Sequence, residues 1–309
     1  MTDAGGHISE KYDKIRRRVR VADYLSVAQI YLKDNFALER PLVFGDVKPR
    51  LLGHFGTCHG INVAYANLRF SEYFKMSDFV LGPGHGFPAL NANLFLDQKL
   101  AEVDERATLD YDGMAHLCRE FSWPGGFPSH ASPMTPGVIT EGGELGYALG
   151  AAFGLALGHP EKNVAVLIGD GELETATALA SLNLVKLLGG PANGKVWPIL
   201  HLNGYKISGP TIYGRKSDHE LGSLFRGFGY MPIFIQDDTA SSFQTALLKA
   251  RGATHPFLIL KSEKGFGSPK RHQDAHQVPL KNPKNDPKEL KMLEKWLALY
   301  HFKMEDLYD

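Results

Sequence analysis

The sequence predicts an α/β fold in which an open, mostly parallel sheet carries helices on both faces. Short apolar runs rich in β-branched residues occupy 164–168, 196–202, 231–235 and 256–260, and segments with helical spacing separate them. Alternating strands and helices are typical of a parallel sheet built from helical crossovers. Two of these runs, 164–168 and 196–202, end in glycine beside a polar residue. Open parallel sheets bind their ligands at that end of the strands, so the site is expected there.

The composition narrows the class of protein. A chain of 309 residues can bury a sizeable core and could form one large domain or two small ones, but the alternation of strands with helices predicts one domain spanning 1–309. Lys plus Arg equals Asp plus Glu, 34 each, so neither a nucleic acid nor a membrane surface is expected as a partner. No apolar run approaches the roughly 18 residues of a membrane span, and the N-terminus lacks a signal-peptide core. Only Cys58 and Cys118 are present, which favours a reducing cytoplasm.

The first half of the chain predicts helices joined by loops rich in glycine and proline. Residues 1–12 read as a frayed polar lead, and apolar spacing predicts helices at 14–32 and 61–74. A short strand at 79–81 runs into a loop of three glycines around His85. Helix is expected in part of 94–116. The loop that follows it has two prolines and two glycines, which exclude regular structure.

The second half alternates more regularly. Its predicted elements are, in chain order, helix 145–157, strand 164–168, helix 175–188, strand 196–202, helix 218–228, strand 231–235, helix 241–251, strand 256–260 and helix 290–300. A helix beginning at Gly143 would present free backbone N–H groups to an anion such as a diphosphate. Core packing explains the small residues of this helix equally well.

A predicted cation site lies at the ends of two neighbouring strands. Asp170, flanked by Gly169 and Gly171, follows one strand, and Asn203 ends the next. A right-handed crossover brings both strand ends to one edge of the sheet. With a nearby backbone carbonyl, these groups form a set of hard oxygen ligands suited to Mg²⁺ or Ca²⁺. An isolated Gly-Asp-Gly is usually an ordinary turn, but here its strand and helix context favours a site.

This arrangement resembles the thiamine diphosphate motif. In proteins with that motif, the Asp, the Asn and a main-chain oxygen two residues later bind the metal that holds the cofactor diphosphate. The resemblance assigns these roles to Asp170, Asn203 and the carbonyl of Tyr205.

Three histidines in glycine-rich loops extend the resemblance to a family. A lone histidine is usually structural, but His54, His85 and His130 all lie where backbone bends point side chains at ligands. The sequence resembles phosphoketolases from residue 24 to the last helix. The segments that carry the resemblance are 50–57, 82–86, 124–130, 141–147, 169–172, 201–207 and 276–280.

The resemblance implies a diphosphate-binding-type thiamine diphosphate fold and an activity. Phosphoketolases cleave xylulose 5-phosphate, and often fructose 6-phosphate, with inorganic phosphate to give acetyl phosphate and a shorter aldose phosphate. His54, His85 and His130 would be catalytic, a role that suits a pKa near neutrality. The positions matching the cofactor-binding set are Gly143, Glu144, Gly169, Asp170, Gly171, Asn203, Lys264 and His276.

The chain departs from the family pattern at two places. Residues 57–60 read Thr-Cys-His-Gly where Thr-Thr-Pro-Gly is usual, and Phe87 stands where glycine is usual. Both changes are expected beside the substrate pocket and leave the native sugar open.

The remaining departure is in length. Family enzymes continue into a pyrimidine-binding domain, whose glutamate activates the cofactor's aminopyrimidine, and into a C-terminal domain. The expectation is therefore one half of a split, oligomeric enzyme, inactive without a separately encoded pyrimidine-binding subunit. Activity of this chain alone would require Glu144 or Glu172 as a replacement.

Two alternatives remain. The first, a split transketolase-like ketol transferase, would use the same histidines and metal motif, although segments 121–130 and 276–280 favour phosphoketolase. The second is a non-catalytic cofactor-binding domain, against which the intact site residues argue.

Overall fold

The computed structural model describes residues 4–188 and 190–308. Within these, five strands form one parallel sheet in the order β1-β2-β3-β7-β6. The strands are β1 (Asp78–Leu81), β2 (Asn163–Gly169), β3 (Lys195–Leu202), β6 (Met231–Ile235) and β7 (Pro256–Lys261). The predicted parallel α/β sheet is thus confirmed. Parallel pairing brings the carboxyl ends of all five strands to one edge.

Successive residues of each strand face two different hydrophobic cores, as the two-residue period of a strand requires. In β2, Ala165 and Leu167 belong to the larger core, whereas Val164, Val166 and Ile168 belong to the other. Both faces of the sheet are therefore covered, which explains why the strand is a continuous apolar run rather than an alternating one.

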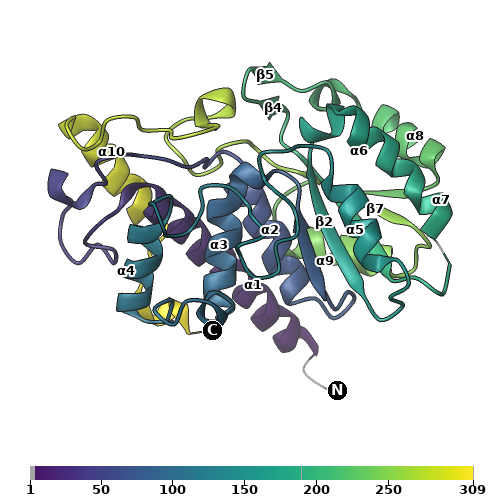
Figure 1. Ribbon diagram of the computed structural model, residues 1–309, viewed down its shortest axis with the longest axis horizontal. Coiled ribbons are helices and arrows are strands. Elements are labelled where there is room, and N and C mark those ends of the chain that lie inside the picture. Colours follow the sequence, from purple (N-terminus) through teal and green to yellow (C-terminus); the bar gives the residue numbers. More distant parts are fainter. Residues whose placement is uncertain (1–3, 189, 309) are drawn as a thin grey trace.

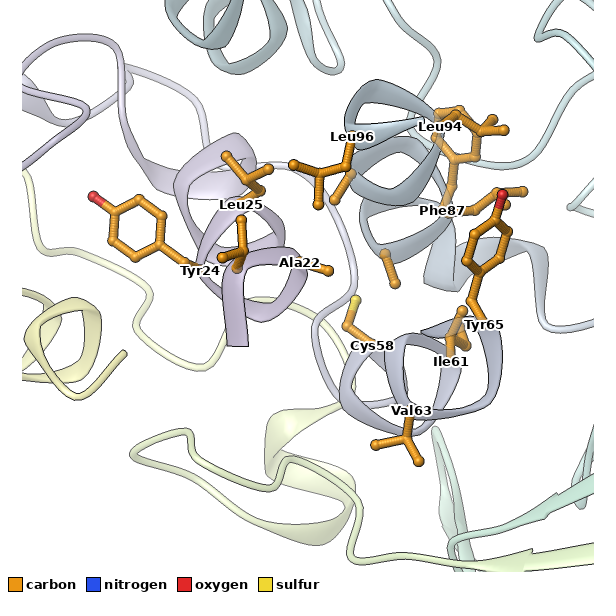
Figure 2. Packing of buried hydrophobic residues seen from close by; sticks show 14 of the residues in the cluster. Ala22, Tyr24, Leu25, Cys58, Ile61, Val63, Tyr65, Phe87, Leu94 and Leu96 are labelled. Atoms are coloured by element: carbon orange, nitrogen blue, oxygen red, sulfur yellow. The ribbon is translucent and has the colours of Figure 1, made fainter. Parts of the chain in front are cut away.

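One face of the sheet packs against a group of helices from both ends of the chain (Figure 1). They are α1 (Ala4–Tyr31), α2 (Cys58–Arg69), α3 (Phe87–Leu96), α4 (Tyr111–Glu120), α9 (Ala240–Arg251) and α10 (Pro287–Ala298). Figure 2 shows apolar side chains of α1, α2 and α3 meeting, with the Cys58 thiol between the helices. Burial raises the pKa of Cys58, so this thiol is a packing group rather than a nucleophile.

The opposite face carries α5 (Ala148–Ala156), α6 (Ala176–Ser181), α7 (Val185–Leu188) and α8 (Asp218–Phe228). Local sequence fixes the ends of α8. Ser217 accepts a hydrogen bond from the Glu220 N–H in a capping box, and Gly229 ends the helix at φ 97°. None of the described helices is long and apolar enough to cross a membrane.

Several predicted boundaries are wrong. The first helix begins at Ala4, so the polar lead is helical from that residue on, and 94–116 divides between the end of α3 and α4. The predicted crossover at 175–188 is α6 and α7 joined by a 3-10 turn at Leu182–Leu184. A small antiparallel hairpin, β4 (Tyr205–Lys206) with β5 (Gly209–Pro210), lies where only a loop was predicted.

Candidate active site

A cavity of about 320 Å³ opens at the carboxyl edge of the sheet. Loops that follow β1, β2, β3 and β7 line it, together with the segment before α2 and the loop before α5. It brings together all but one of the predicted site residues: His54, His85, His130, Gly143, Gly169, Asp170, Gly171, Asn203, Tyr205, Lys264 and His276. Glu144 is the exception, because it is exposed and absent from the lining.

Four histidines form one cluster in this cavity. The ring of His54 is central, with its centroid 5.2 Å from that of His85, 5.0 Å from His130 and 5.2 Å from His276. His85 and His276 lie 4.8 Å apart. These residues come from four separate segments, so the fold assembles the cluster.

The histidines are neutral near pH 7. Burial lowers the pKa of His54 to about 4 and of His276 to about 3, and it lowers those of His85 and His130 as well. A neutral imidazole offers one donor and one acceptor nitrogen. Within the described part of the chain, Nδ1 of His54 and Nδ1 of His276 are buried without a hydrogen-bond partner. Buried polar atoms are normally paired, so these two unpaired nitrogens mark an unusual polar environment at the cavity.

Asp170 lies at the end of β2, where it is 2% exposed. Its Oδ2 accepts hydrogen bonds from Gly204 N at 2.6 Å and Thr211 Oγ1 at 2.9 Å, and its Oδ1 accepts one from Gly171 N at 2.9 Å. Burial raises the pKa of Asp170 to about 6, although these hydrogen bonds and the charge of Lys264 act to lower it. A carboxylate in such a site is stabilised by a neighbouring cation.

The pairing of β2 with β3 brings Asn203 close to Asp170. Gly169 of β2 is paired with His201 of β3, so the side chains of Asp170 and Asn203 extend from neighbouring strand ends. Lys264 Nζ donates to the Tyr205 carbonyl at 2.7 Å and is 2% exposed. Burial lowers its pKa to about 8, while Asp170 acts in the opposite direction. An ammonium group therefore contacts the carbonyl that the sequence assigned to a metal ion.

These residues fit a divalent cation. A carboxylate, an amide oxygen and a backbone carbonyl line one cavity, and hard cations prefer oxygen ligands. Across 4–188 and 190–308, no group of three or more His, Cys, Asp or Glu side chains could hold a metal. The predicted metal ligands include only one such side chain, the Asp170 carboxylate, so the absence of these groups does not bear on the predicted ligands.

Close backbone packing shapes the cavity wall. A Cβ on Gly84 would lie 2.1 Å from the Cα of Gly142, so only glycine fits there. Ala131 N donates to Gly84 O at 2.9 Å and fixes the same contact. The prediction of a helix beginning at Gly143 is wrong, because α5 begins at Ala148. The Gly143 N–H group therefore belongs to a loop at the cavity rather than to a helix N-terminus.

Glu172 was predicted only as a possible replacement for the absent glutamate, and not as a cofactor-binding or catalytic residue. It lines the cavity, is 3% exposed, and its carboxylate accepts from Gly169 N and Gly146 N, both at 3.1 Å. Burial raises its pKa to about 7. Its position directly after Gly171 was a signal, but sequence alone does not reveal a carboxylate joining β2 to the loop before α5.

The departures from the family pattern lie behind the cavity wall rather than in it. Cys58 and Phe87 are fully buried, and neither they nor His59 line the cavity. Cys58 Sγ donates to the carbonyl of His54 at 3.1 Å, so it contacts the wall from behind. These residues therefore lie beside the cavity, as expected, but do not line it.

Comparison with known proteins gives a consistent family. The XFP N-terminal domain family matches residues 7–251. A probable phosphoketolase of Bradyrhizobium diazoefficiens is 42% identical over 97% of this chain and 41% of its own length. A probable phosphoketolase of Nitrosospira multiformis is 42% identical over 100% of this chain and 43% of its own length. The chain thus spans less than half the length of these relatives.

Solved structures share the fold at lower identity. A transketolase from Campylobacter jejuni covers 95% of this chain and 45% of its own, with a TM-score of 0.66 and 19% identity. A transketolase from Leishmania mexicana covers 97% and 45%, with a TM-score of 0.64 and 19% identity. At this identity the likeness shows the fold alone.

Proposed function

Because this chain belongs to the phosphoketolase family, matching its XFP N-terminal domain, we propose that it supplies the diphosphate-binding half of a thiamine diphosphate-dependent phosphoketolase. The reaction is cleavage of xylulose 5-phosphate, and of fructose 6-phosphate as a second substrate, by inorganic phosphate. The products are acetyl phosphate and an aldose phosphate. The observation that carries the proposal is that the histidine cluster and the Asp170–Asn203 pair line one cavity.

The proposed cofactor site uses oxygen atoms at the ends of β2 and β3. Asp170, Asn203 and the Tyr205 carbonyl would hold Mg²⁺, or Ca²⁺, against the cofactor diphosphate, beside the backbones of Gly143, Gly169 and Gly171. Thiamine diphosphate supplies the carbanion stabilisation when bound. Glu144 is left out of this set because it lies outside the cavity.

The proposed work of the histidines is orientation and proton transfer. His54, His85 and His130 are neutral, so each can donate a hydrogen bond to a sugar hydroxyl or accept one, and for His130 this falls to Nε2 because Ser129 Oγ lies 3.0 Å from Nδ1. His276 and Lys264 lie on the side of the cavity formed by the loop after β7, and we assign them to the phosphate groups. Lys264 Nζ donates to the Tyr205 carbonyl here, and it would be released to a phosphate group if a metal ion held that oxygen.

We further propose that a separately encoded pyrimidine-binding subunit completes the enzyme. Apolar side chains exposed at and beside the cavity support this. Leu145 and Ile207 line the cavity and are 40% and 61% exposed, and Tyr147 and Ile212 are 53% and 58% exposed. Clustered apolar groups on a surface are typical of a covered interface.

The test is acetyl phosphate release from xylulose 5-phosphate and phosphate, with thiamine diphosphate and Mg²⁺. We expect turnover when this chain is mixed with a pyrimidine-binding subunit made from the relatives' remaining sequence, and none from either alone. Full activity of this chain alone would overturn the split arrangement. No acetyl phosphate from the mixture, despite cofactor binding, would overturn the activity.

A transketolase-type transfer is the second candidate, because the same histidine cluster and the Asp170–Asn203 pair in one cavity would serve it equally. The same mixture distinguishes the two. If the phosphoketolase proposal holds, replacing phosphate by an aldose phosphate acceptor should not yield a ketose phosphate with a longer carbon chain. A longer ketose phosphate, without acetyl phosphate, would establish the transfer reaction instead.

A further inference from the structure

His59 is held between two carboxylates from distant parts of the chain. Its Nδ1 lies 2.7 Å from Oδ2 of Asp23 on α1, and its Nε2 lies 2.9 Å from Oδ2 of Asp238, which precedes α9. Asn62 Nδ2 donates to the other oxygen of Asp23 at 2.7 Å. The imidazole therefore ties the start of α2 to α1 and to the β6–α9 turn.

The geometry favours a charged His59. Both ring nitrogens face carboxylate oxygens, and only an imidazolium carries N–H groups on both. Burial acts to lower the pKa of His59, but the two aspartates raise it to about 10. Arg16 and Arg20 of α1 line the same cavity as His59, and Arg20 is paired with Asp306. The two aspartates are thus the acidic partners that contact the ring.

The ring of His59 also stacks on Phe266. Their centroids are 4.4 Å apart and their planes 29° apart. Phe266 belongs to residues 262–280, named here the β7 loop, which also carries Lys264 and His276 of the active-site cavity. A residue behind the cavity wall thus contacts the loop that supplies two of the groups in the cavity.

The β7 loop lies along the segment that carries His54. Gly265 N donates to Gly56 O at 2.8 Å, and Phe55 N donates to Gln277 O at 2.9 Å. A Cβ on Gly56 would lie 2.7 Å from the Ala275 carbonyl oxygen, so the two backbones touch. A shift of the β7 loop therefore changes the spacing of the histidine cluster.

Phe266 has room to move if the stack is lost. It is 43% exposed and borders a second cavity of about 700 Å³, which Asp23, His59 and Asp238 also line. Because that space is open, surrounding side chains do not fix the ring of Phe266. The stack on His59 therefore holds it in place.

We propose that His59 is a positioning residue, which, clamped between Asp23 and Asp238, holds Phe266 and thereby the β7 loop so that Lys264 and His276 stay in the active-site cavity. The catalytic consequence rests on the proposed function, whereas the mechanical part does not. The chain has this clamp at a position where the family pattern has proline.

The mechanical part is tested by amide hydrogen exchange of the whole chain, without cofactor. His59→Gln removes the imidazolium, and Phe266→Ala removes the other half of the stack while leaving the ion pairs. Each should speed exchange in the β7 loop by about tenfold, the order expected for a lost aromatic contact. Exchange in β2 and β3 should stay unchanged in Phe266→Ala, because this variant keeps both ion pairs of His59.

His116→Gln is the matched control. His116 Nε2 lies 2.7 Å from Asp104 Oδ2, and its ring meets Phe127 edge-on at 5.6 Å, so it loses the same kinds of contact elsewhere. It should leave exchange of the β7 loop unchanged. Unchanged loop exchange in either variant, or a rise in β2 and β3 equal to that of the loop in Phe266→Ala, would overturn the positioning role.

The catalytic part is tested in the acetyl phosphate assay. Both variants should raise the KM for the sugar phosphate several-fold more than they lower kcat, and the double variant should be no worse than either single one. Faster loop exchange without a change in KM would overturn the link to the site. If the unmodified protein makes no acetyl phosphate but the exchange result holds, only the proposed function fails.

Discussion

Replacing Asp170 by Asn should make the metal-free protein more stable at pH 7, although Asp170 is the central residue of the proposed site. Its pKa rises from 3.8 to about 6 on folding, which corresponds to about 3 kcal/mol against the charged form at 1.36 kcal/mol per unit. Asn keeps the acceptors for Gly204 and Thr211 but turns an amide group toward Gly171 N, losing about 1 kcal/mol. The net gain is about 1–2 kcal/mol.

The stability gained through Asp170→Asn should increase as the pH rises. The folded pKa lies above the unfolded one, so the penalty on Asp170 is absent below pH 3.8, grows as the pH rises, and is complete above about 6. Urea denaturation at pH 4 should therefore show the variant slightly less stable, and at pH 7 more stable. Asp104→Asn is the control with opposite sign, since Arg106 and His116 hold the pKa of that carboxyl below its usual range.

Ligand should reverse the ranking of the two proteins. Mg²⁺ with thiamine diphosphate should raise the stability of the unmodified chain, and the variant should bind them at least about 100-fold more weakly, since even outer-shell partners of a metal are worth 10–100-fold. The reasoning is refuted if Asp170→Asn destabilises the free chain equally at pH 4 and 7, or if its response to cofactor and Mg²⁺ is unchanged.

Three further outcomes are expected. Replacing His54, His85 or His130 by Asn should lower turnover by about 10²–10⁴-fold. The affinity for the cofactor, measured by calorimetry, should fall by less than tenfold. Acetyl phosphate formation at the wild-type rate would leave these histidines with a structural role only. Gly84→Ala should destabilise the fold by about 1–3 kcal/mol in thermal unfolding, whereas Gly154→Ala on α5, with open space around it, should not; equal effects would contradict the close packing. His59→Gln should lower the free energy of unfolding by about 3–5 kcal/mol at pH 6. This difference should shrink between pH 6.5 and about 10, because the raised pKa of His59 makes its stabilisation complete only below pH 6.5. A difference that does not depend on pH would refute the charged clamp.

The sheet was predictable because its strands are local apolar runs with clear ends. The adjacency of Asp170 and Asn203 followed from one crossover rule, and the register of β2 with β3 brings both to one cavity. The division of 94–116 was not predictable, because its apolar residues suit a helix and only tertiary packing ends α3 at Leu96.

The contacts that tune the site were out of reach of the sequence. His59 meets Asp23 and Asp238 across 36 and 179 residues, and no local pattern marks such a pair. Glu172 is an ordinary surface-type residue by composition, and only its burial between two glycine N–H groups makes it part of the site. Long-range pairing and burial decide both cases.

The central claim is that the cavity holds a diphosphate-bound cation on Asp170, Asn203 and the Tyr205 carbonyl. Its most direct test is a crystal structure of this chain, together with its pyrimidine-binding subunit, grown with Mn²⁺ and thiamine diphosphate and measured for anomalous scattering. We predict one peak in contact with these three oxygen atoms, at about 2.0–2.2 Å as for Mg²⁺-type sites, with Lys264 Nζ displaced from the carbonyl. A diphosphate bound elsewhere, or a peak without Asp170, would contradict the account.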